Sequence, residues 1–235
     1  MALIELNNVS KIYDGTAVPV KAVDNVSLKI EEGEFAAIVG PSGSGKTTLL
    51  NLIGGLDQPN DGKIIVDGTD ISTFKPDDLI NFRLHHIGFV FQAYNLVPVF
   101  TAKENVEFIM LLQKISKAKR EKKAIEFLKA VGLEDRINSK PTELSGGQQQ
   151  RVAVARALAS TPSFVLADEP TANLDSVSAD SLLDLMENLN HDHKMTFVFS
   201  THDNRVIQRA HRVITLRDGA IESDRNHNEN FTKSS

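Results

Sequence analysis

The sequence predicts an α/β fold with a mainly parallel sheet, an N-terminal antiparallel β layer and an inserted α-helical subdomain. Three observations support this prediction: short runs that are wholly apolar, alternating apolar and polar residues near the N-terminus, and amphipathic helical patterns in the middle of the chain. With 235 residues, of which 41% are hydrophobic, the chain is long enough to bury the core of one large domain.

The N-terminal part of the chain is predicted to form strands. Val26, Leu28 and Ile30 alternate with polar residues, which is the period of a strand with one buried face. Residues 63–66, which precede an Asp-Gly turn, are expected to join the same antiparallel layer. Three shorter runs are apolar at every position, as is typical of central parallel strands covered on both faces. These runs span residues 35–39, 164–167 and 197–199.

The middle of the chain is predicted to be helical. Thr101 and Glu104 have the spacing of a capping box, in which each residue caps the other at the start of a helix. Ser116 is expected to cap a second helix, which ends at Gly132.

These patterns also predict the domain organisation. We expect one domain over residues 1–223, with the helical subdomain inserted at about residues 93–160. Residues 224–235 are polar and have little to bury, so they are expected to form a mobile C-terminal tail.

Composition excludes several classes of function. Lys and Arg number 26 against 31 for Asp and Glu, a net charge of −5, so nucleic acid is not an expected partner. The absence of cysteine excludes disulfides, thiolate metal sites and cysteine nucleophiles. The N-terminus does not resemble a secretory signal, and no apolar run reaches the roughly 18–20 residues that span a bilayer. We therefore expect no direct membrane insertion.

A glycine-rich segment, GPSGSGKT, follows the apolar run at 35–39 and precedes an amphipathic helical pattern. Its glycines let successive backbone N–H groups converge on one phosphate. Lys46 supplies a full charge to the β- and γ-phosphates, and the Thr47 hydroxyl is placed to ligate Mg²⁺. This P-loop predicts a nucleoside triphosphate, a ligand shared by kinases, GTPases, helicases and transport ATPases. The residues expected to bind it are Gly40, Pro41, Ser42, Gly43, Ser44, Gly45, Lys46, Thr47 and Thr48.

Two adjacent carboxylates follow the apolar run at 164–167. Ligands of parallel sheets bind outside the carboxyl ends of the strands, so Asp168 and Glu169 are expected to face the P-loop. Asp168 is placed to hold Mg²⁺, and Glu169 to reach the water in line with the γ-phosphate. Pro170 then ends the strand.

A second helix start with the features of an anion site occurs at LSGGQ, Leu144 to Gln148. Ser145 is a good N-cap, and the two glycines after it allow close approach of a ligand to the backbone. A phosphate held on one side by the P-loop has an open opposite side that such a helix start could cover.

Together these segments resemble the ATP-binding subunit of ABC transporters. The resemblance rests on GPSGSGKT, LSGGQ and VLADEPTANLDS, with His202 after FVFST, and covers roughly residues 3–222. It implies a P-loop NTPase core and an ATPase that uses ATP and Mg²⁺. In that family two subunits pack head to tail, so the resemblance implies a homodimer with ATP sandwiched between a P-loop and the partner's signature. The signature residues expected to act in trans are Leu144, Ser145, Gly146, Gly147 and Gln148.

The same resemblance implies roles for further residues. Tyr13 matches the aromatic residue that stacks on adenine, although its position also suits a half-buried tyrosine at a strand end. Gln92 matches the glutamine that senses Mg²⁺ and the attacking water and begins the segment facing the membrane partner. Asp175 matches the aspartate that crosses the dimer interface, and His202 the switch histidine that contacts the γ-phosphate. The expected catalytic residues are thus Glu169, His202 and Gln92, and the expected metal ligands are Thr47, Gln92 and Asp168.

Within the family, GGLDQPNDG and ADEPTANLDS are most similar to the bacterial lipoprotein-releasing (LolD-like) and macrolide-efflux (MacB-like) group, although Ala172 stands where many members carry glycine. This implies a cytoplasmic ATPase held on the inner face of the cell membrane by a separate integral membrane permease subunit. ATP-driven dimer closure would power efflux or substrate extraction. Two alternatives stay open: an FtsE-like mechanotransmitter that moves no solute, and an importer subunit.

Overall fold

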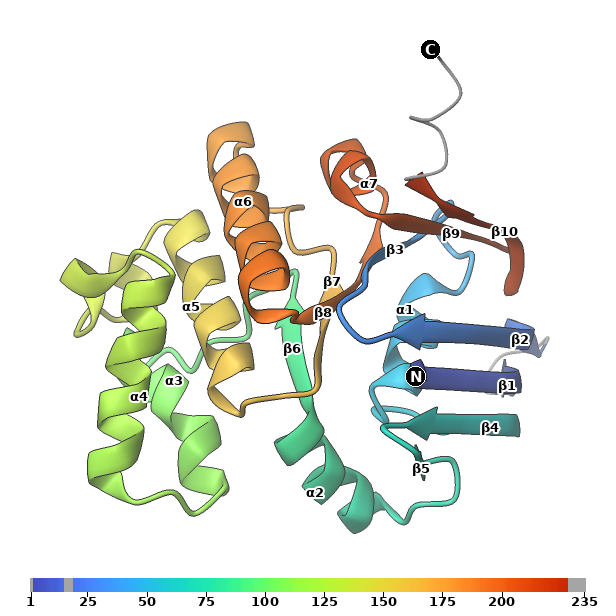
Figure 1. The fold of residues 1–235 in the computed structure, drawn as a ribbon, viewed down its shortest axis with the longest axis horizontal. Helices are drawn as coiled ribbons and strands as arrows, with labels where there is room; N and C mark the ends of the chain where they lie inside the picture. The colour runs from blue at the N-terminus through green and yellow to red at the C-terminus, as the bar shows by residue number, and fades with distance from the viewer. Residues whose placement is uncertain (1, 15–18, 228–235) are drawn as a thin grey trace.

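A computed structural model describes residues 2–14 and 19–227 (Figure 1). Helices and strands alternate along most of this length, as expected for an α/β fold. In chain order the elements are β1 (Ala2–Tyr13), β2 (Val20–Glu31), β3 (Phe35–Val39), α1 (Lys46–Ile53), β4 (Asp61–Val66), β5 (Thr69–Asp70), α2 (Pro76–His86), β6 (Ile87–Phe91), α3 (Ala102–Leu112), α4 (Lys117–Ala130), η1 (Glu134–Arg136), η2 (Pro141–Glu143), α5 (Gly146–Ala159), β7 (Phe164–Asp168), α6 (Ser176–His193), β8 (Thr196–Thr201), α7 (Asn204–Arg209), β9 (Arg212–Arg217) and β10 (Ala220–Asn226).

The described residues form two sheets. The first is antiparallel and has the order β2-β1-β4-β5, so the predicted N-terminal layer, including residues 63–66, is confirmed. The second has the order β10-β9-β3-β8-β7-β6, and its strands run parallel except for β10 at one edge. Figure 1 shows α1 next to the strands of the antiparallel layer, and its apolar residues pack in a core cluster that both sheets share.

The central strands are buried on both faces, as their continuous apolar runs predict. In β3, Phe35 and Ala37 join the core beneath the helices α3 to α6, whereas Ala36 and Ile38 join the core shared with α1 and the antiparallel layer. Strands β7 and β8 alternate between the same two cores. Because each face is covered, no polar residue is needed within these strands.

The helices α3, α4 and α5 lie between β6 and β7 in the chain and pack against one another (Figure 1, left). The predicted capping box at the start of α3 is confirmed: Thr101 Oγ1 accepts from Glu104 N at 3.2 Å, and the Glu104 carboxylate accepts from Thr101 N at 2.7 Å. Ser116 does precede α4, but the prediction that its hydroxyl caps this helix is wrong. Its backbone carbonyl accepts from Arg120 N instead, and the side chain makes no capping bond.

Helix α2 was not predicted. Its sequence lacks an apolar stripe, since only Leu79 and Phe82 are buried, so periodicity gives no signal there. Its start is favoured by other features: a proline at the first helical position and two aspartates in the first turn.

The C-terminal strand β10 extends to Asn226, so the prediction of a mobile tail from residue 224 is wrong for residues 224–226. Strand β10 pairs with β9, and Arg212 Nη2 lies 2.6 Å from Asp224 Oδ2. Pairing of the backbone with a neighbouring strand stabilises these residues although they bury little side-chain area. The next residue, His227, donates its N–H to His211 O at 2.8 Å, and the rest of the predicted tail, residues 228–235, lies outside the described residues.

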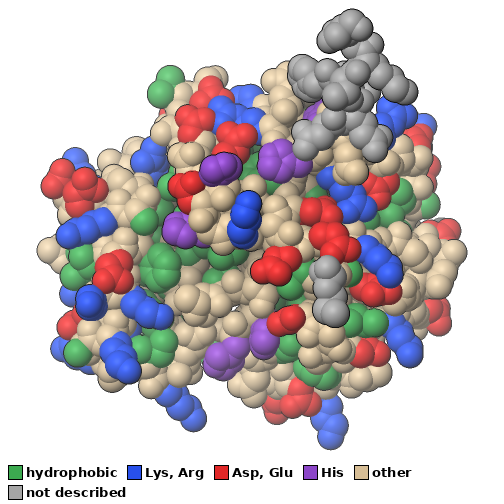
Figure 2. Space-filling model, in the orientation of Figure 1, with side chains coloured by type: hydrophobic (Ala, Val, Ile, Leu, Met, Phe, Trp, Pro, Cys, Tyr) green, Lys and Arg blue, Asp and Glu red, His purple; other side chains and the backbone are tan. Residues whose placement is uncertain are grey.

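None of the described helices has both the length and the apolar character required to cross a bilayer. On the face shown in Figure 2, acidic and basic side chains are intermixed.

Candidate active site

A hollow of about 520 Å³ opens at the carboxyl ends of the central parallel strands. The P-loop follows β3, Gln92 follows β6, Glu169 follows β7 and His202 follows β8, so one edge of the sheet brings these segments together. The residues that line the hollow are Val20, Ala22, Gly40, Pro41, Ser42, Gly43, Gly45, Lys46, Thr47, Thr48, Gln92, Glu169, Ala172 and His202.

The P-loop conformation requires glycine at two positions. Gly40 and Gly45 have φ of 154° and 99°, and a Cβ there would lie 2.2 Å from the carbonyl oxygen of Leu216 and 2.1 Å from that of Ala22. Only glycine fits so close to a neighbouring backbone. The loop backbone therefore passes close to β9 at Gly40 and close to β2 at Gly45.

The start of α1 is suited to an anion. The helix begins at Lys46, directly after Gly45, so its free N–H groups and positive dipole end face the hollow. The Lys46 ammonium lies over the loop and donates to the carbonyls of Gly40 at 2.9 Å and Pro41 at 3.0 Å. Ser44 is buried, and its hydroxyl has no hydrogen-bond partner in the described structure. These donors fit a polyphosphate.

Oxygen atoms suited to a divalent cation lie beside the P-loop. The Thr47 hydroxyl lies 3.3 Å from Asp168 Oδ1. Burial raises the pKa of the Asp168 carboxyl, and the neighbouring charge of Glu169 adds to this. A hydroxyl and a carboxylate are ligands that Mg²⁺ prefers, and phosphate oxygens usually complete its shell. The pair therefore fits a nucleotide-bound magnesium ion.

The Glu169 carboxylate is fixed by β8 and by the residue after it. Glu169 has a backbone φ of 46°, which is uncommon for a residue other than glycine. Its N–H donates to Ser200 O at 2.8 Å. Oε2 accepts from the Thr201 hydroxyl at 3.0 Å, and Oε1 lies 2.6 Å from His202 Nδ1. This arrangement presents a carboxylate and an imidazole to the hollow together, a pairing able to orient a water molecule and accept its proton.

The segment after β6 is joined to two other parts of the site. The Gln92 carbonyl accepts from Asn173 Nδ2 at 3.0 Å. The buried Gln150 side chain of α5 donates to Phe91 O at 3.4 Å and Pro170 O at 2.8 Å. A shift of α5 would therefore move the backbone next to Gln92 and the turn after Glu169.

The LSGGQ segment forms the start of α5 with a full capping box. Ser145 Oγ accepts from Gln148 N at 3.3 Å, and Gln148 Oε1 accepts from Ser145 N at 3.0 Å, so the predicted N-cap is confirmed. Leu144 is buried. No residue from 144 to 148 lines the hollow formed by the described residues. The structure thus keeps the two glycine-rich helix starts of one chain apart.

The two signature glycines lie against other loops. A Cβ on Gly146 would lie 2.8 Å from the Tyr94 hydroxyl, and one on Gly147 would lie 2.9 Å from the Ser178 side chain. Asp175, the N-cap of α6, accepts from Ser178 N at 2.9 Å. The starts of α5 and α6 are therefore adjacent, and Asp175 lies beside the signature, outside the hollow.

Sequence patterns missed the apolar lining of the hollow. Val20 and Ala22 lie on β2, where an apolar strand residue gives no sign that it faces a ligand. Tyr13, which does not line the hollow, pairs in register with Val20 and so lies at the rim. Only the pairing register of β1 with β2 could have shown that Tyr13 lies next to the apolar lining residue Val20.

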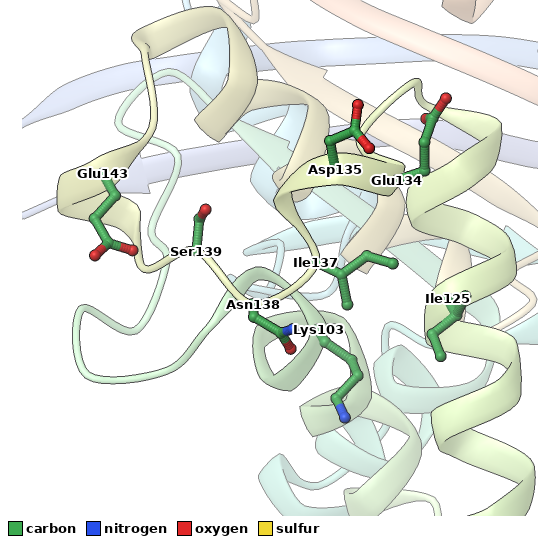
Figure 3. A pocket seen from close by; sticks show the side chains of 8 residues that line it. All are labelled: Lys103, Ile125, Glu134, Asp135, Ile137, Asn138, Ser139 and Glu143. Carbon is green, nitrogen blue, oxygen red and sulfur yellow. The ribbon is translucent and has the colours of Figure 1, made fainter.

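A separate hollow of about 530 Å³ lies in the helical part of the molecule, between α3, α4 and the segment with η1 and η2 (Figure 3). Its walls carry side chains of both charges and none of the predicted site residues, so it is not the candidate site. It is lined by Lys103, Ile125, Glu134, Asp135, Ile137, Asn138, Ser139 and Glu143.

Comparison with known proteins decides the family. Residues 23–172 match the family model described as ABC transporter. The chain belongs to the ABC transporter family. The dimeric structure of the ATP-binding cassette MJ0796 in a post-hydrolysis state with ADP and Pi is 44% identical, with a TM-score of 0.88 over 95% of this chain and 98% of that chain. The family match and this similarity confirm the predicted ATPase and the predicted fold class.

Two curated relatives show how the cassette occurs elsewhere. The macrolide export ATP-binding/permease protein MacB of Hyphomonas neptunium is 49% identical over 94% of this chain, which spans only 34% of that protein. An uncharacterized ABC transporter ATP-binding protein of Thermotoga maritima is 46% identical over 94% of both chains. Cassettes similar to this chain therefore make up almost all of one relative and about one third of another.

Proposed function

We propose that this cassette is the ATP-hydrolysing subunit of an efflux or substrate-extraction transporter and works as a homodimer that closes around two ATP molecules. The separation of the two helix starts carries the proposal. The start of α1 faces the hollow, whereas residues 144–148 at the start of α5 do not line it. A second copy, packed head to tail, supplies the missing donors to the open side of the γ-phosphate. Dimeric structures of a similar cassette support this arrangement.

The positions of the hydrogen-bond donors and of the oxygen ligands in the hollow suggest which residues bind phosphate and which bind metal. Lys46 and the N–H groups of the P-loop bind the β- and γ-phosphates. Thr47, Asp168 and Gln92 hold Mg²⁺, which when bound neutralises charge that develops on the phosphates. The 3.3 Å approach of Thr47 to Asp168 and the place of Gln92 in the hollow support this assignment.

The hydrolytic roles rest on the contacts of one carboxylate. Glu169 orients the attacking water and accepts its proton, held in place by the Thr201 hydroxyl. His202, 2.6 Å from Glu169, contacts the γ-phosphate and keeps the carboxylate aligned. Asp175 crosses to the partner, since it lies beside the signature that the partner site needs. Closure can do work because these contacts between subunits form mainly when ATP is bound.

An apolar groove provides a place for the membrane subunit. This docking groove of about 550 Å³ lies between α2, β6 and α3, and exposes the apolar side chains of Leu56, Ile80 and Leu112. Phe91 and Asn95, on either side of Gln92, line its wall. We propose that a short amphipathic segment of an integral membrane permease fills it, which would hold the cassette on the cytoplasmic face of the membrane. The fusion of cassette and permease in MacB relatives supports this partner.

A Glu169→Gln variant tests the proposal. We expect its ATPase rate to fall about 10²- to 10⁴-fold, because the positioned base is lost, while ATP still binds and the dimer accumulates. Light scattering with and without ATP measures the dimer. A Glu187→Gln variant, which changes a surface carboxylate of α6, should keep the normal rate and dissociate after hydrolysis. Normal turnover in Glu169→Gln would contradict the catalytic role, and a strictly monomeric ATP-bound form would contradict the dimer.

A further inference from the structure

The ring of Tyr13 is held by two side chains that take no part in the proposed phosphate chemistry. Its hydroxyl donates to Asp57 Oδ2 at 2.8 Å. The other oxygen of the same carboxylate, Oδ1, accepts from Lys11 Nζ at 2.6 Å. Lys11 Nζ also lies 5.1 Å from the centroid of the Tyr13 ring, so it covers one face of the ring. The ring is thus fixed both at its hydroxyl and on one face.

Asp57 ties this ring to the phosphate site. It lies just after α1, where the N–H groups of Leu56 and Asp57 donate to Asn51 O at 2.8 and 3.3 Å. The first turn of the same helix contains Thr48, which lines the hollow beside the P-loop. One helix therefore sets the position of the Tyr13 ring relative to the P-loop.

The charges at this cluster are well matched. Partial burial alone would raise the pKa of Asp57, but hydrogen bonds from Lys11 and Tyr13 outweigh it and the pKa lies below its usual value. Burial, and then the Asp57 carboxylate, raise the pKa of Tyr13. At neutral pH the carboxylate is ionised and the phenol keeps its proton, so the direction of the hydrogen bond is fixed. The side chains of Lys11 and Asp57 are only 13% and 29% exposed, which limits their freedom to separate.

We infer that Asp57, together with Lys11, is a positioning residue for the nucleotide base: it holds Tyr13 with one face covered and leaves the opposite face for the base of the bound nucleotide. The inference rests on the proposed function and on the stacking of adenine on Tyr13 that the family resemblance implies. A ring that is already ordered loses less conformational entropy when the base binds, so affinity rises. Stacking is tolerant of base identity, so the effect should extend to GTP.

A comparison of two ligands, one with a base and one without, distinguishes a role of Asp57 in base binding from a general effect on the P-loop. The intact chain is titrated, in the presence of Mg²⁺, with a non-hydrolysable ATP analogue and with inorganic tripolyphosphate, which has no base. Tyr13→Ala should weaken analogue binding about 5- to 150-fold, the range expected for loss of one stacked base. Asp57→Asn should weaken it about 3- to 10-fold and raise KM more than it lowers kcat. Tripolyphosphate affinity should change by less than about twofold in both variants.

Three further variants serve as controls. Tyr13→Phe keeps the ring but removes the hydroxyl, so it should match Asp57→Asn, and the double variant should be no weaker than either single one. Asp57→Glu, which keeps the carboxylate, should restore part of the affinity. Glu5→Gln is the matched control, since Glu5 lies on β1 and pairs with Lys29 at 3.2 Å, away from Tyr13 and Asp57. This variant should leave analogue affinity unchanged.

Each contrary outcome contradicts a different statement. Unchanged analogue affinity in Tyr13→Ala would contradict stacking itself. A loss in Tyr13→Ala without a loss in Asp57→Asn and Tyr13→Phe would overturn the positioning role and leave stacking intact. Equal losses for the analogue and tripolyphosphate in Asp57→Asn would show that Asp57 only supports α1 and the P-loop, and would also overturn the inference.

Discussion

Two adjacent leucines at the end of α3 provide a matched test of the docking groove. Leu111 and Leu112 are 48% and 49% exposed, but only Leu112 lines the docking groove, while Leu111 lies in a separate hollow between α3 and α4. Replacement of either by aspartate places a negative charge at the C-terminal end of the same helix, at a cost of about 0.3–1 kcal/mol in both variants. Any difference between them therefore reports on the groove.

The expected size of the effect follows from the exposure of Leu112. Complete burial of a leucine side chain is worth about 1.5–3 kcal/mol, so covering its exposed half contributes about 0.8–1.5 kcal/mol to docking. A buried carboxylate without a partner adds a further cost of about 1–3 kcal/mol. Together these terms amount to about 2–4.5 kcal/mol, which corresponds to a Kd for the proposed membrane subunit about 30- to 1500-fold higher in Leu112→Asp.

The assay measures copurification of the cassette with the proposed membrane subunit in detergent, and the stimulation of ATPase activity by that subunit. Leu112→Asp should lose both, whereas Leu111→Asp should keep both. The thermal unfolding midpoints of the two isolated variants show whether each has folded equally well. Equal copurification of the two variants, with equal midpoints, would refute the assignment of this groove to the membrane subunit.

Three further changes have clear expected outcomes. Gly45→Ala should abolish ATP binding, measured by calorimetry, because its Cβ would lie 2.1 Å from the Ala22 carbonyl oxygen. Thr101→Ala should lower the free energy of unfolding by about 1 kcal/mol in urea titrations, since it removes the cap of α3. Hydrogen bonds from Arg205 lower the pKa of Asp203 from 3.8 to about 2. The ionised carboxylate therefore stabilises the fold fully above pH 3.8, and this stabilisation is lost as the pH falls toward 2. Asp203→Asn should therefore cost about 1–2 kcal/mol at pH 7, and the difference from the unmodified chain should shrink between about pH 4 and pH 2.

The chemistry of the P-loop could be read from the sequence because it depends on local features. Glycine at 40 and 45 has φ of 154° and 99°, a local backbone conformation that residues with a side chain rarely adopt. The apolar run before Gly40 predicted a strand buried on both faces, which the two cores around β3 confirm. The family followed from the same local segments, and the match over residues 23–172 confirms it.

Features that depend on pairing between strands were not predictable in the same way. Val20 and Ala22 line the hollow only because β2 pairs with β1 and passes beside the P-loop. The end of β10 provides the opposite example: Asp224 was assigned to a tail because it has little to bury, yet it pairs with Arg212 of β9. Periodicity describes which residues are apolar, but backbone pairing stabilises polar residues as well.

Asp57 shows why a positioning residue is hard to find from sequence. In GGLDQPNDG it precedes a turn, where an aspartate is usually solvated, and its partners Lys11 and Tyr13 lie on the first strand, far away in the chain. Only the packing of α1 against the antiparallel layer brings the three side chains together. A carboxylate that receives a lysine and a phenol at 2.6 and 2.8 Å is held too firmly to be a solvated turn residue. If base binding depends on that geometry, exchanging Lys11 and Asp57 should preserve their ion pair but remove the acceptor for Tyr13, and nucleotide affinity should fall as far as in Asp57→Asn.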